Sequence, residues 1–193
     1  GLHCATGSLA GVALSVLAPA LTRARQRRRP SIRLAAQNAR AGSSPEEVVR
    51  MASLGASEGL KTKEVLAAME SLEEAPRPAK QAVVEGTYEL VFTSALAGVP
   101  FLDGFMPTRE ILTFDFEQKR EMSLVVETLP FLPPVTVIGE KCSFDEAAGL
   151  IKYTVKGKDK ESVWRVIYAD EDVLAARSNV TGLNIARRIR ETT

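Results

Sequence analysis

The sequence predicts an α+β, mainly β domain in which two short N-terminal helices cap a closed antiparallel β-barrel. From Ala82 onward, apolar and polar residues alternate over about eight short segments, which is the pattern of half-buried strands. Turn-forming residues separate these segments, and no helix-length segment lies between them, which argues against a parallel α/β fold. We therefore expect consecutive strands to pair with their neighbours and to close into a barrel.

Two helices are predicted before the strands. Ser44 and Glu47 form a capping box with proline at the first helical position, which predicts a helix over Pro45–Leu54. A second helix is predicted to begin near Thr62 and to end before Pro76. Its apolar residues recur at helical spacing and are Val65, Leu66, Met69 and Leu72.

The predicted strands are Val84–Thr93, Arg109–Phe116, Glu121–Glu127, Val135–Phe144, Leu150–Val155, Ser162–Tyr168, Val173–Ser178 and Leu183–Ile189. A closed barrel of this size has room inside for packed side chains or for one small ligand, and the sequence leaves both alternatives open. The residues expected to face inward are Tyr88, Leu90, Phe92, Leu112, Phe114, Leu124, Val126, Ile151, Tyr153, Trp164, Val166 and Tyr168.

Charge divides the chain near Pro45. Seven arginines and no acid precede this residue, whereas from Pro45 onward 18 basic residues stand against 24 acidic ones. The acidic balance of this second part disfavours a nucleic-acid surface, because phosphate binding needs clustered lysine and arginine. We therefore expect a targeting segment over residues 1–44 and a folded domain over residues 45–193.

The first part has the pattern of a targeting segment. Leu9–Leu21 is almost wholly apolar and too short to span a bilayer, which is typical of a signal-peptide h-region. Thr22–Ser44 is rich in arginine and free of acids, like an organellar transit peptide. A two-part address for a plastid with extra envelope membranes and a simple chloroplast transit peptide both fit this pattern. The alternative is a basic tail that binds acidic partners.

The residue types present argue against several enzyme classes. The single histidine, His3, lies in the targeting segment, and the two cysteines, Cys4 and Cys142, fall one in each part of the chain. A His-based zinc site, a Ser-His triad and a structural disulfide are therefore not expected. We expect no catalytic residue, no metal and no cofactor.

Two connections are more apolar than loops usually are, namely residues 95–107 and 129–134. Such a segment forms the lid of a cavity, dips into a lipid surface, or folds back and plugs the barrel. The residues expected to form a lid or to contact lipid are Leu96, Phe101, Leu102, Phe105, Met106, Phe131 and Leu132.

Three polar features have both a structural and a functional interpretation. Asp170–Asp172 is a carboxylate cluster, but the next two residues supply no further oxygen ligands, which favours a hairpin turn capped by Asp170 over a metal site. Arg177 either pairs with one of these carboxylates or meets a ligand headgroup. Lys156–Lys160 is either a solvated hairpin tip or a contact to anionic lipid.

Three stretches resemble, in order and spacing, the plastid lipid-associated protein (fibrillin) family. Val48–Pro78 resembles the family's helical opening with its Gly-Leu step and following prolines. Gly86–Ser94 resembles its Gly-x-Trp-x-Leu-x-Tyr-Thr-Ser strand, with Tyr88 in place of tryptophan and Phe92 in place of tyrosine. Trp164–Asn179 resembles the end of the family's domain.

This resemblance covers about residues 46–187. It implies a lipocalin-like barrel and association with plastoglobules and thylakoid membranes, where family members are implicated in holding lipids or isoprenoids. The missing strand tryptophan leaves the identity of the ligand unspecified. The residues expected to bind a ligand are Tyr88, Leu90, Phe92, Phe114, Leu124, Tyr153, Trp164, Tyr168 and Arg177.

We therefore expect a plastid protein that binds lipids or isoprenoids and associates peripherally with a lipid-particle or thylakoid surface. The competing class is an enzyme of the same barrel shape that uses Tyr153, Tyr168 or the Asp170 cluster on a hydrophobic substrate. A third alternative is a purely structural coat protein of lipid particles.

Overall fold

The computed structural model of the chain describes residues 43–77, 79–127 and 132–190. All of them belong to the second of the two units into which the chain's contacts divide it, Asn38–Thr193. The predicted targeting segment, apart from its last two residues, lies outside the described residues.

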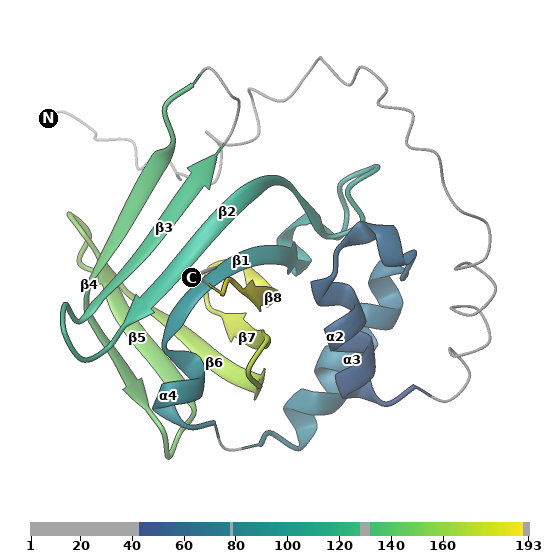
Figure 1. Cartoon of the computed structure of the whole chain (residues 1–193), viewed down its shortest axis with the longest axis horizontal. Helices are drawn as coiled ribbons and strands as arrows, with labels where there is room; N and C mark the ends of the chain where they lie inside the picture. The colour runs from purple at the N-terminus through teal and green to yellow at the C-terminus, as the bar shows by residue number, and fades with distance from the viewer. Residues whose placement is uncertain (1–42, 78, 128–131, 191–193) are drawn as a thin grey trace, which may run out of the picture. The chain divides into compact units, whose positions relative to one another are not determined.

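Short helices precede and interrupt a series of eight strands in the described residues, as Figure 1 shows. The helices are α2 (Pro45–Ser53), η2 (Ala56–Glu58), α3 (Thr62–Glu74), α4 (Gln81–Val84) and η3 (Ser94–Leu96), where η marks a 3₁₀ helix. The strands are β1 (Gly86–Thr93), β2 (Phe105–Asp115), β3 (Glu121–Glu127), β4 (Val135–Asp145), β5 (Leu150–Val155), β6 (Glu161–Ala169), β7 (Val173–Ser178) and β8 (Gly182–Arg188).

The strands form one closed antiparallel barrel. Each strand pairs with its neighbour in the sequence, and β8 pairs with β1 to complete the circle. Closure gives every described strand a partner on both sides, which removes open edges. The predicted fold class, a mainly β, α+β domain with a lipocalin-like antiparallel barrel, is confirmed, and the strands follow in the predicted order.

Two predicted boundaries differ from the structure by two residues or more, and several others by one residue. The first strand was expected from Val84, but this residue ends the helical turn α4 and β1 begins only at Gly86. The second strand begins at Phe105 instead of Arg109, so part of the expected apolar loop is strand. Both differences arise because contacts from distant parts of the chain set these boundaries.

Residues of β1 and β8 hold α4 in place. The hydroxyl of Tyr88 lies 2.9 and 3.0 Å from the carbonyl oxygens of Val83 and Val84, and the guanidinium of Arg188 donates to the carbonyls of Val83 and Glu85. The same guanidinium lies 4.7 Å from the centre of the Tyr88 ring. Gly86 has a φ of 139°, a conformation that other residues rarely adopt, and a Cβ atom here would also press on the guanidinium of Arg188, so this position favours glycine. The helical turn therefore depends on partners that local sequence does not reveal.

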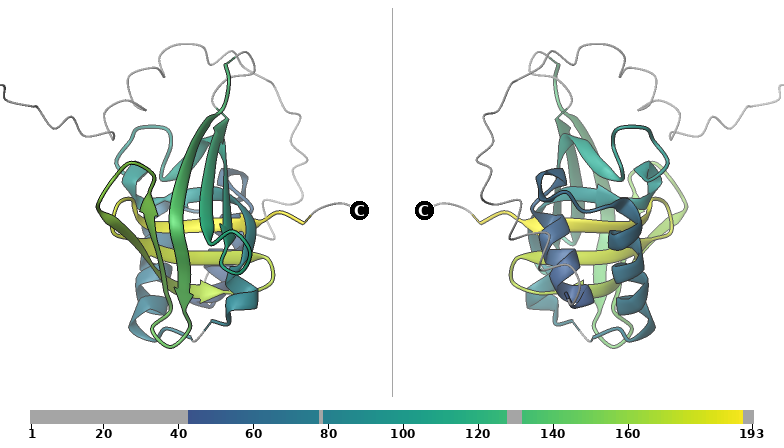
Figure 2. Two further views of the ribbon diagram at one scale, coloured as in Figure 1. Left: turned by 90° about the vertical axis from the view of Figure 1, so that its left-hand side faces the viewer. Right: turned by 90° about the vertical axis from the view of Figure 1, so that its right-hand side faces the viewer.

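The helices α2 and α3 pack against the outside of the barrel wall. Helix α2 contacts β1, β7 and β8, and α3 contacts β6; Figure 2 shows both helices on one side of the strands. The capping box of Ser44 and Glu47 is present as predicted. The fully buried residues Val49, Val65 and Met69 anchor the helices in an outer hydrophobic cluster.

Bulges in two strands decide which residues belong to this outer cluster. In β1, Leu90 faces Ala186 of the inner cluster, but after a register shift Phe92 faces Ile185 of the outer cluster. A shift in β6 likewise places Tyr168 on the outer face. Each extra residue reverses the side of the sheet to which the next residue points. The expectation that Phe92 and Tyr168 face inward is therefore wrong.

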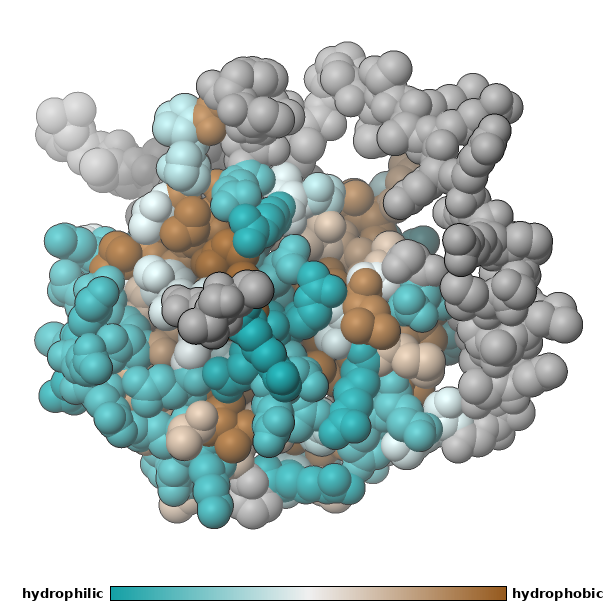
Figure 3. Space-filling model, viewed as in Figure 1, coloured by the Kyte–Doolittle hydropathy of each residue, from teal (hydrophilic) through white to brown (hydrophobic). Residues whose placement is uncertain are grey.

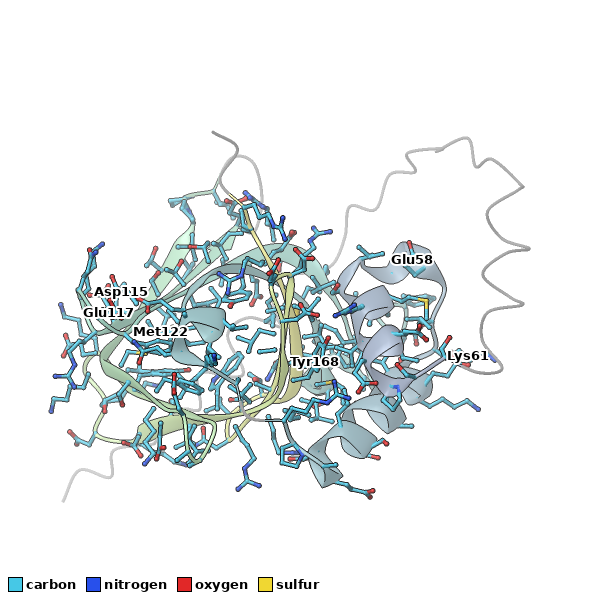
Figure 4. The ribbon with its side chains drawn as sticks, turned by 60° about the horizontal axis from the view of Figure 1, so that its bottom comes forward. Glu58, Lys61, Asp115, Glu117, Met122 and Tyr168 are labelled. Atoms are coloured by element: carbon cyan, nitrogen blue, oxygen red, sulfur yellow. The ribbon has the colours of Figure 1, made fainter. Side chains whose placement is uncertain are left out.

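A hydrogen-bonded network fixes α2 to the β6–β7 hairpin. The carboxylate of Asp170 accepts hydrogen bonds from the backbone N–H groups of Asp172 and Val173, both at 2.8 Å, which confirms the predicted hairpin cap. It also accepts from the hydroxyl of Tyr168 at 2.6 Å and from Nε of Arg50 at 2.8 Å. Figure 4 shows Tyr168 between the barrel and the helices.

We expect the substitution Asp170→Asn to lower the free energy of unfolding at pH 7 by about 1–2 kcal/mol, because several hydrogen bonds to a charged group are weakened. Burial raises the pKa of Asp170, but the hydrogen bonds from Tyr168 and the backbone and the charge of Arg50 outweigh it and hold this pKa below its ordinary value. The stabilisation is present above the pKa of the unfolded chain and is lost as the pH falls through the lower folded-state pKa.

Urea unfolding at pH 7 and in acid measures this difference, which should shrink in acid. The exposed neighbour Glu171 provides the control, because Glu171→Gln in the same turn should change stability little. Equal stability of the Asp170→Asn variant and the wild type at pH 7 would contradict the role given to the network.

Candidate functional site

The two ends of the barrel differ in composition. Because consecutive strands are antiparallel, successive connections alternate between the ends. One end carries α4 and the β2–β3, β4–β5 and β6–β7 connections, and we call it the α4 end. The other end carries the remaining connections, and we call their described residues the rim: 94–104, 132–134, 156–160 and 179–181.

Aromatic side chains fill the interior at the α4 end. The ring of Phe114 lies 5.9 Å from the rings of both Phe116 and Trp164 and 6.5 Å from that of Tyr88. Phe116 in turn stacks on Phe144 at 5.8 Å. Such contacts pack an interior closely, so this half of the barrel is a core.

Toward the rim the inner face of β3 and β4 becomes accessible. Along β3, Met122 is 2% exposed, whereas Leu124 and Val126 are only partly buried. Along β4, Val137 is partly buried and Val135, which faces Val126, is 56% exposed. Figure 3 shows apolar surface over the upper part of these strands. The barrel therefore presents an accessible apolar inner wall at its rim end.

One carboxyl group lies on this apolar wall. In the strand register Glu110 stands between Leu90 and Val126, both of which are inner-face positions. Burial raises the pKa of Glu110, partly offset by a hydrogen bond with the side chain of Thr108. At this position the carboxyl group can bond the polar end of an otherwise apolar molecule.

Two adjoining grooves lie where the α2–α3 connection meets the β1–β2 segment, and they share Ala56 and Phe105. The larger has a volume of about 630 Å³ and is lined by Leu60, Lys61, Lys63, Phe101 and Leu102 among others. The smaller has about 230 Å³ and is lined by Leu54, Leu90, Met106, Thr108 and Arg187 among others. The smaller groove follows the stretch between the pairs Leu90–Glu110 and Phe92–Phe105, where four residues of β2 stand opposite one residue of β1.

The β1–β2 connection exposes a strained aromatic residue. Phe101 is 98% exposed and has a φ of 72°, a left-handed conformation that costs a non-glycine residue about 1–3 kcal/mol. The connection is anchored just after this residue: Thr62 Oγ1 donates to the carbonyl of Asp103 at 2.6 Å, and Gly104 lies against the ring of Phe92. A fixed loop therefore holds Phe101 out in solvent.

Most of the expected ligand-binding residues lie in the inner cluster. They are Tyr88, Leu90, Phe114, Leu124, Tyr153 and Trp164, and their role in binding stays a prediction. Phe92 and Tyr168 lie in the outer cluster because of the two bulges. Arg177 is also outside, where Nε and one terminal nitrogen hold the carboxylate of Glu73 at 2.7 and 2.6 Å. The expected pairing of Arg177 with the Asp170 cluster or with a ligand headgroup is therefore replaced by an ion pair with α3.

The residues expected to form a lid or to contact lipid differ in their burial. Phe105 is 6% exposed and packs on Phe92 with 5.4 Å between ring centres, so it is outer core and neither lid nor lipid contact. Leu96 and Leu102 in the loop and Met106 in β2 are partly buried. Phe101 and Leu132 are exposed, at 98% and 43%, and Phe131 lies outside the described residues.

Sequence reasoning missed Glu110, Val135 and Val137. A signal for Glu110 existed, because it shares the parity of Leu112 and Phe114 on the same strand, and an acid at an inward position is unusual. The accessibility of the two valines had no comparable signal, since it depends on where the barrel opens.

The fold and the site together define a closed antiparallel barrel with a packed end and an accessible apolar end, and this architecture is compatible with a lipid-binding, lipocalin-like protein. Comparison of the chain with family models, with curated proteins and with solved structures finds no match. In residues 43–77, 79–127 and 132–190, no three His, Cys, Asp or Glu side chains are grouped to hold a metal ion. None of the described helices has the length and hydropathy needed to cross a membrane.

We expect Gly104→Ala to destabilise the protein by at least about 1–2 kcal/mol, because this glycine has a φ of 85° and an added Cβ would lie 2.3 Å from the ring of Phe92. Gly98→Ala in the same connection is the matched control, since nothing lies within 4 Å of its added Cβ. Thermal unfolding of both variants measures the effect. Equal melting temperatures would show that Gly104 does not fix this loop on Phe92.

We expect Glu110→Gln to raise the melting temperature at pH 7. The pKa of Glu110 is raised in the folded protein, so the fold loses stability as the pH rises above the unfolded pKa and through the folded one. The gain from the neutral glutamine should therefore be largest near neutral pH and vanish near pH 4. Glu74→Gln on the exposed side of α3 is the control; a lower melting temperature for Glu110→Gln would mean that the ionised carboxylate is well stabilised.

Proposed function

We propose that this protein binds an apolar ligand, a lipid or an isoprenoid, in the rim half of its barrel and associates peripherally with a lipid surface. The single observation that carries the proposal is the accessible apolar inner wall of Leu124, Val126, Val135 and Val137. Such a wall in contact with water is unfavourable by roughly 25 cal/mol per Å², and a bound apolar molecule would recover this free energy.

The proposed activity is reversible binding without a catalytic step. The tyrosines that an enzyme of this shape would use are engaged in structural hydrogen bonds: Tyr153 accepts one from the indole of Trp164 at 3.2 Å, and Tyr168 donates to Asp170. Burial raises the pKa of both phenols above the ordinary value, so neither is an effective base near neutral pH. These observations favour a binding protein over an enzyme.

The cellular setting that we propose is a plastid, at plastoglobule or thylakoid surfaces. This part of the proposal is supported by the arginine-rich, acid-free pattern before Pro45 and by the resemblance of residues 46–187 to the plastid lipid-associated protein family. Membership in that family is proposed on the same grounds.

The only tryptophan of the chain provides a direct test, because Trp164 belongs to the inner cluster and is 7% exposed. We expect a dibrominated stearic acid to quench its fluorescence in a saturable, one-to-one manner. Leu124→Gln should weaken this binding at least about tenfold, since it removes a leucine-sized apolar contact. Val125→Gln, on the opposite face of the same strand, is the matched control and should leave binding nearly unchanged.

Quenching that does not saturate, or equal effects of the two substitutions, would contradict a binding site inside the barrel. If the quenching is saturable, native mass spectrometry with lipid extraction, on the chain purified from a plastid-containing host, would identify the bound ligand. An empty barrel in a protein that still floats with lipid particles would favour the structural coat protein.

A further inference from the structure

The exposed large apolar side chains of the described residues gather around one end of the barrel. They are Leu54, Phe101, Leu132, Val135 and Val180, with exposed fractions between 43% and 98%. Phe101, Leu132 and Val180 belong to three different connections of the rim, and Val135 begins β4 at the same end. Leu54 is the C-cap residue of α2 and lines the smaller groove beside β1 and β2. Five residues from separate parts of the chain therefore contribute to a common apolar face.

The two ends of the barrel also differ in the charged residues that their connections carry. The rim carries three exposed lysines of the β5–β6 connection, and Lys61 and Lys63 line the larger groove beside Phe101. The acids of the rim are Asp103 and Asp159. The connections that follow α4 and join the strands at the α4 end hold six acids and two basic residues: Glu85, Glu117, Glu146, Asp170, Glu171 and Asp172 against Lys119 and Arg120. Lys80 precedes α4 at the same end, and Arg50 and Arg190 pair with Asp170, Glu171 and Asp172.

The rim lysines are mostly available for an external partner. Lys156 lies 3.9 Å from Glu140, with both side chains largely exposed, which is a weak contact. Among the described residues, Lys158 and Lys160 make no ion pair within 4 Å. A face that combines protruding apolar side chains with unpaired lysines matches the surface of a membrane with anionic lipids, because the lysines meet the headgroups and the apolar side chains enter the acyl boundary.

From this we infer that the rim is a docking face for an anionic lipid surface, and that docking turns the accessible inner wall of the barrel toward the lipid. The inference rests on the proposed function and adds to it the face, the orientation and the charge class of the lipid. The α4 end, where Glu85, Glu117 and Glu146 make no ion pair within 4 Å among the described residues, points away from the anionic surface, which disfavours these acids. Figure 2 shows α4 and the upper ends of β3 and β4 at opposite ends of the barrel.

This orientation has a consequence for ligand exchange. Leu124, Val126 and Val137 lie on the inner face below the apolar rim residues, so the wall and the rim form one continuous apolar path. An apolar molecule can pass from the lipid into the barrel along this path without crossing water. The docking face is therefore also the entrance to the proposed binding site.

The charge requirement is tested on vesicles of phosphatidylcholine with and without added phosphatidylglycerol. We expect Lys158→Gln with Lys160→Gln to weaken binding to the anionic vesicles at least about tenfold, since each lysine near such a surface contributes about fivefold. The matched control is Lys80→Gln with Lys119→Gln, which removes two exposed lysines at the α4 end and should change binding less than about twofold. The arginine-rich residues 1–44 are identical in all variants and cancel in the comparison.

The orientation is tested by depth-dependent quenching with brominated phosphatidylcholine in the anionic vesicles. The double variant Trp164→Phe with Phe101→Trp should be quenched strongly on binding. Trp164→Phe with Gln118→Trp, which places the reporter in the exposed β2–β3 connection of the α4 end, should not be quenched. The lysine variants keep Trp164, so their result stands even where loss of this buried residue lowers stability.

Equal quenching of the two reporters, or equal effects of the two lysine pairs, would overturn the inference. So would a wild-type chain that binds neither kind of vesicle. In that last case the saturable quenching of Trp164 by brominated stearic acid still decides separately whether the barrel binds an apolar ligand.

Discussion

Pairing of β1 with β8 is the constraint on which the rest of the structure depends. It closes the sheet, so that every position has an inside or an outside, and it places Arg188 at the end of β8 beside Tyr88 near the start of β1. These two residues together fix α4 across one end of the barrel. Without closure, neither the packed aromatic end nor the accessible apolar end would exist, because both are defined by the enclosed interior.

The bulges in β1 and β6 convert this simple barrel into a domain with a second core. Each reverses the direction of an aromatic side chain, and Phe92 and Tyr168 leave the interior for the surface on which α2 and α3 pack. Arg50 of α2 donates hydrogen bonds to both Tyr168 and Asp170. The helices are therefore attached through apolar packing and a directed polar network, while the rim half of the barrel is left uncovered. The part of the barrel that the helices stabilise and the part whose inner wall is accessible therefore lie at different places along the same barrel.

The two ends of the barrel differ in their connections and in the strand residues next to them. Short acidic hairpins and aromatic packing occupy the α4 end, whereas the rim combines apolar tips with lysines. Between the two ends, the strands need only alternate apolar and polar residues. The two sets of connections can therefore differ in composition. A barrel built in this way has one end closed by aromatic packing and another end with accessible apolar surface.

The sequence by itself determined the number and order of the strands, the capping box of α2 and the cap of the β6–β7 hairpin, because alternation, turn residues and capping are local signals. It also indicated ten of the twelve expected inward residues correctly, among them Leu124 and Trp164. Only the tertiary structure decided the faces of Phe92 and Tyr168, the partner of Arg177 and the helical turn at Val84, since bulges and long-range contacts set them. It also decided where the interior opens, because accessibility depends on how far neighbouring strands extend together and on which end the helices leave uncovered.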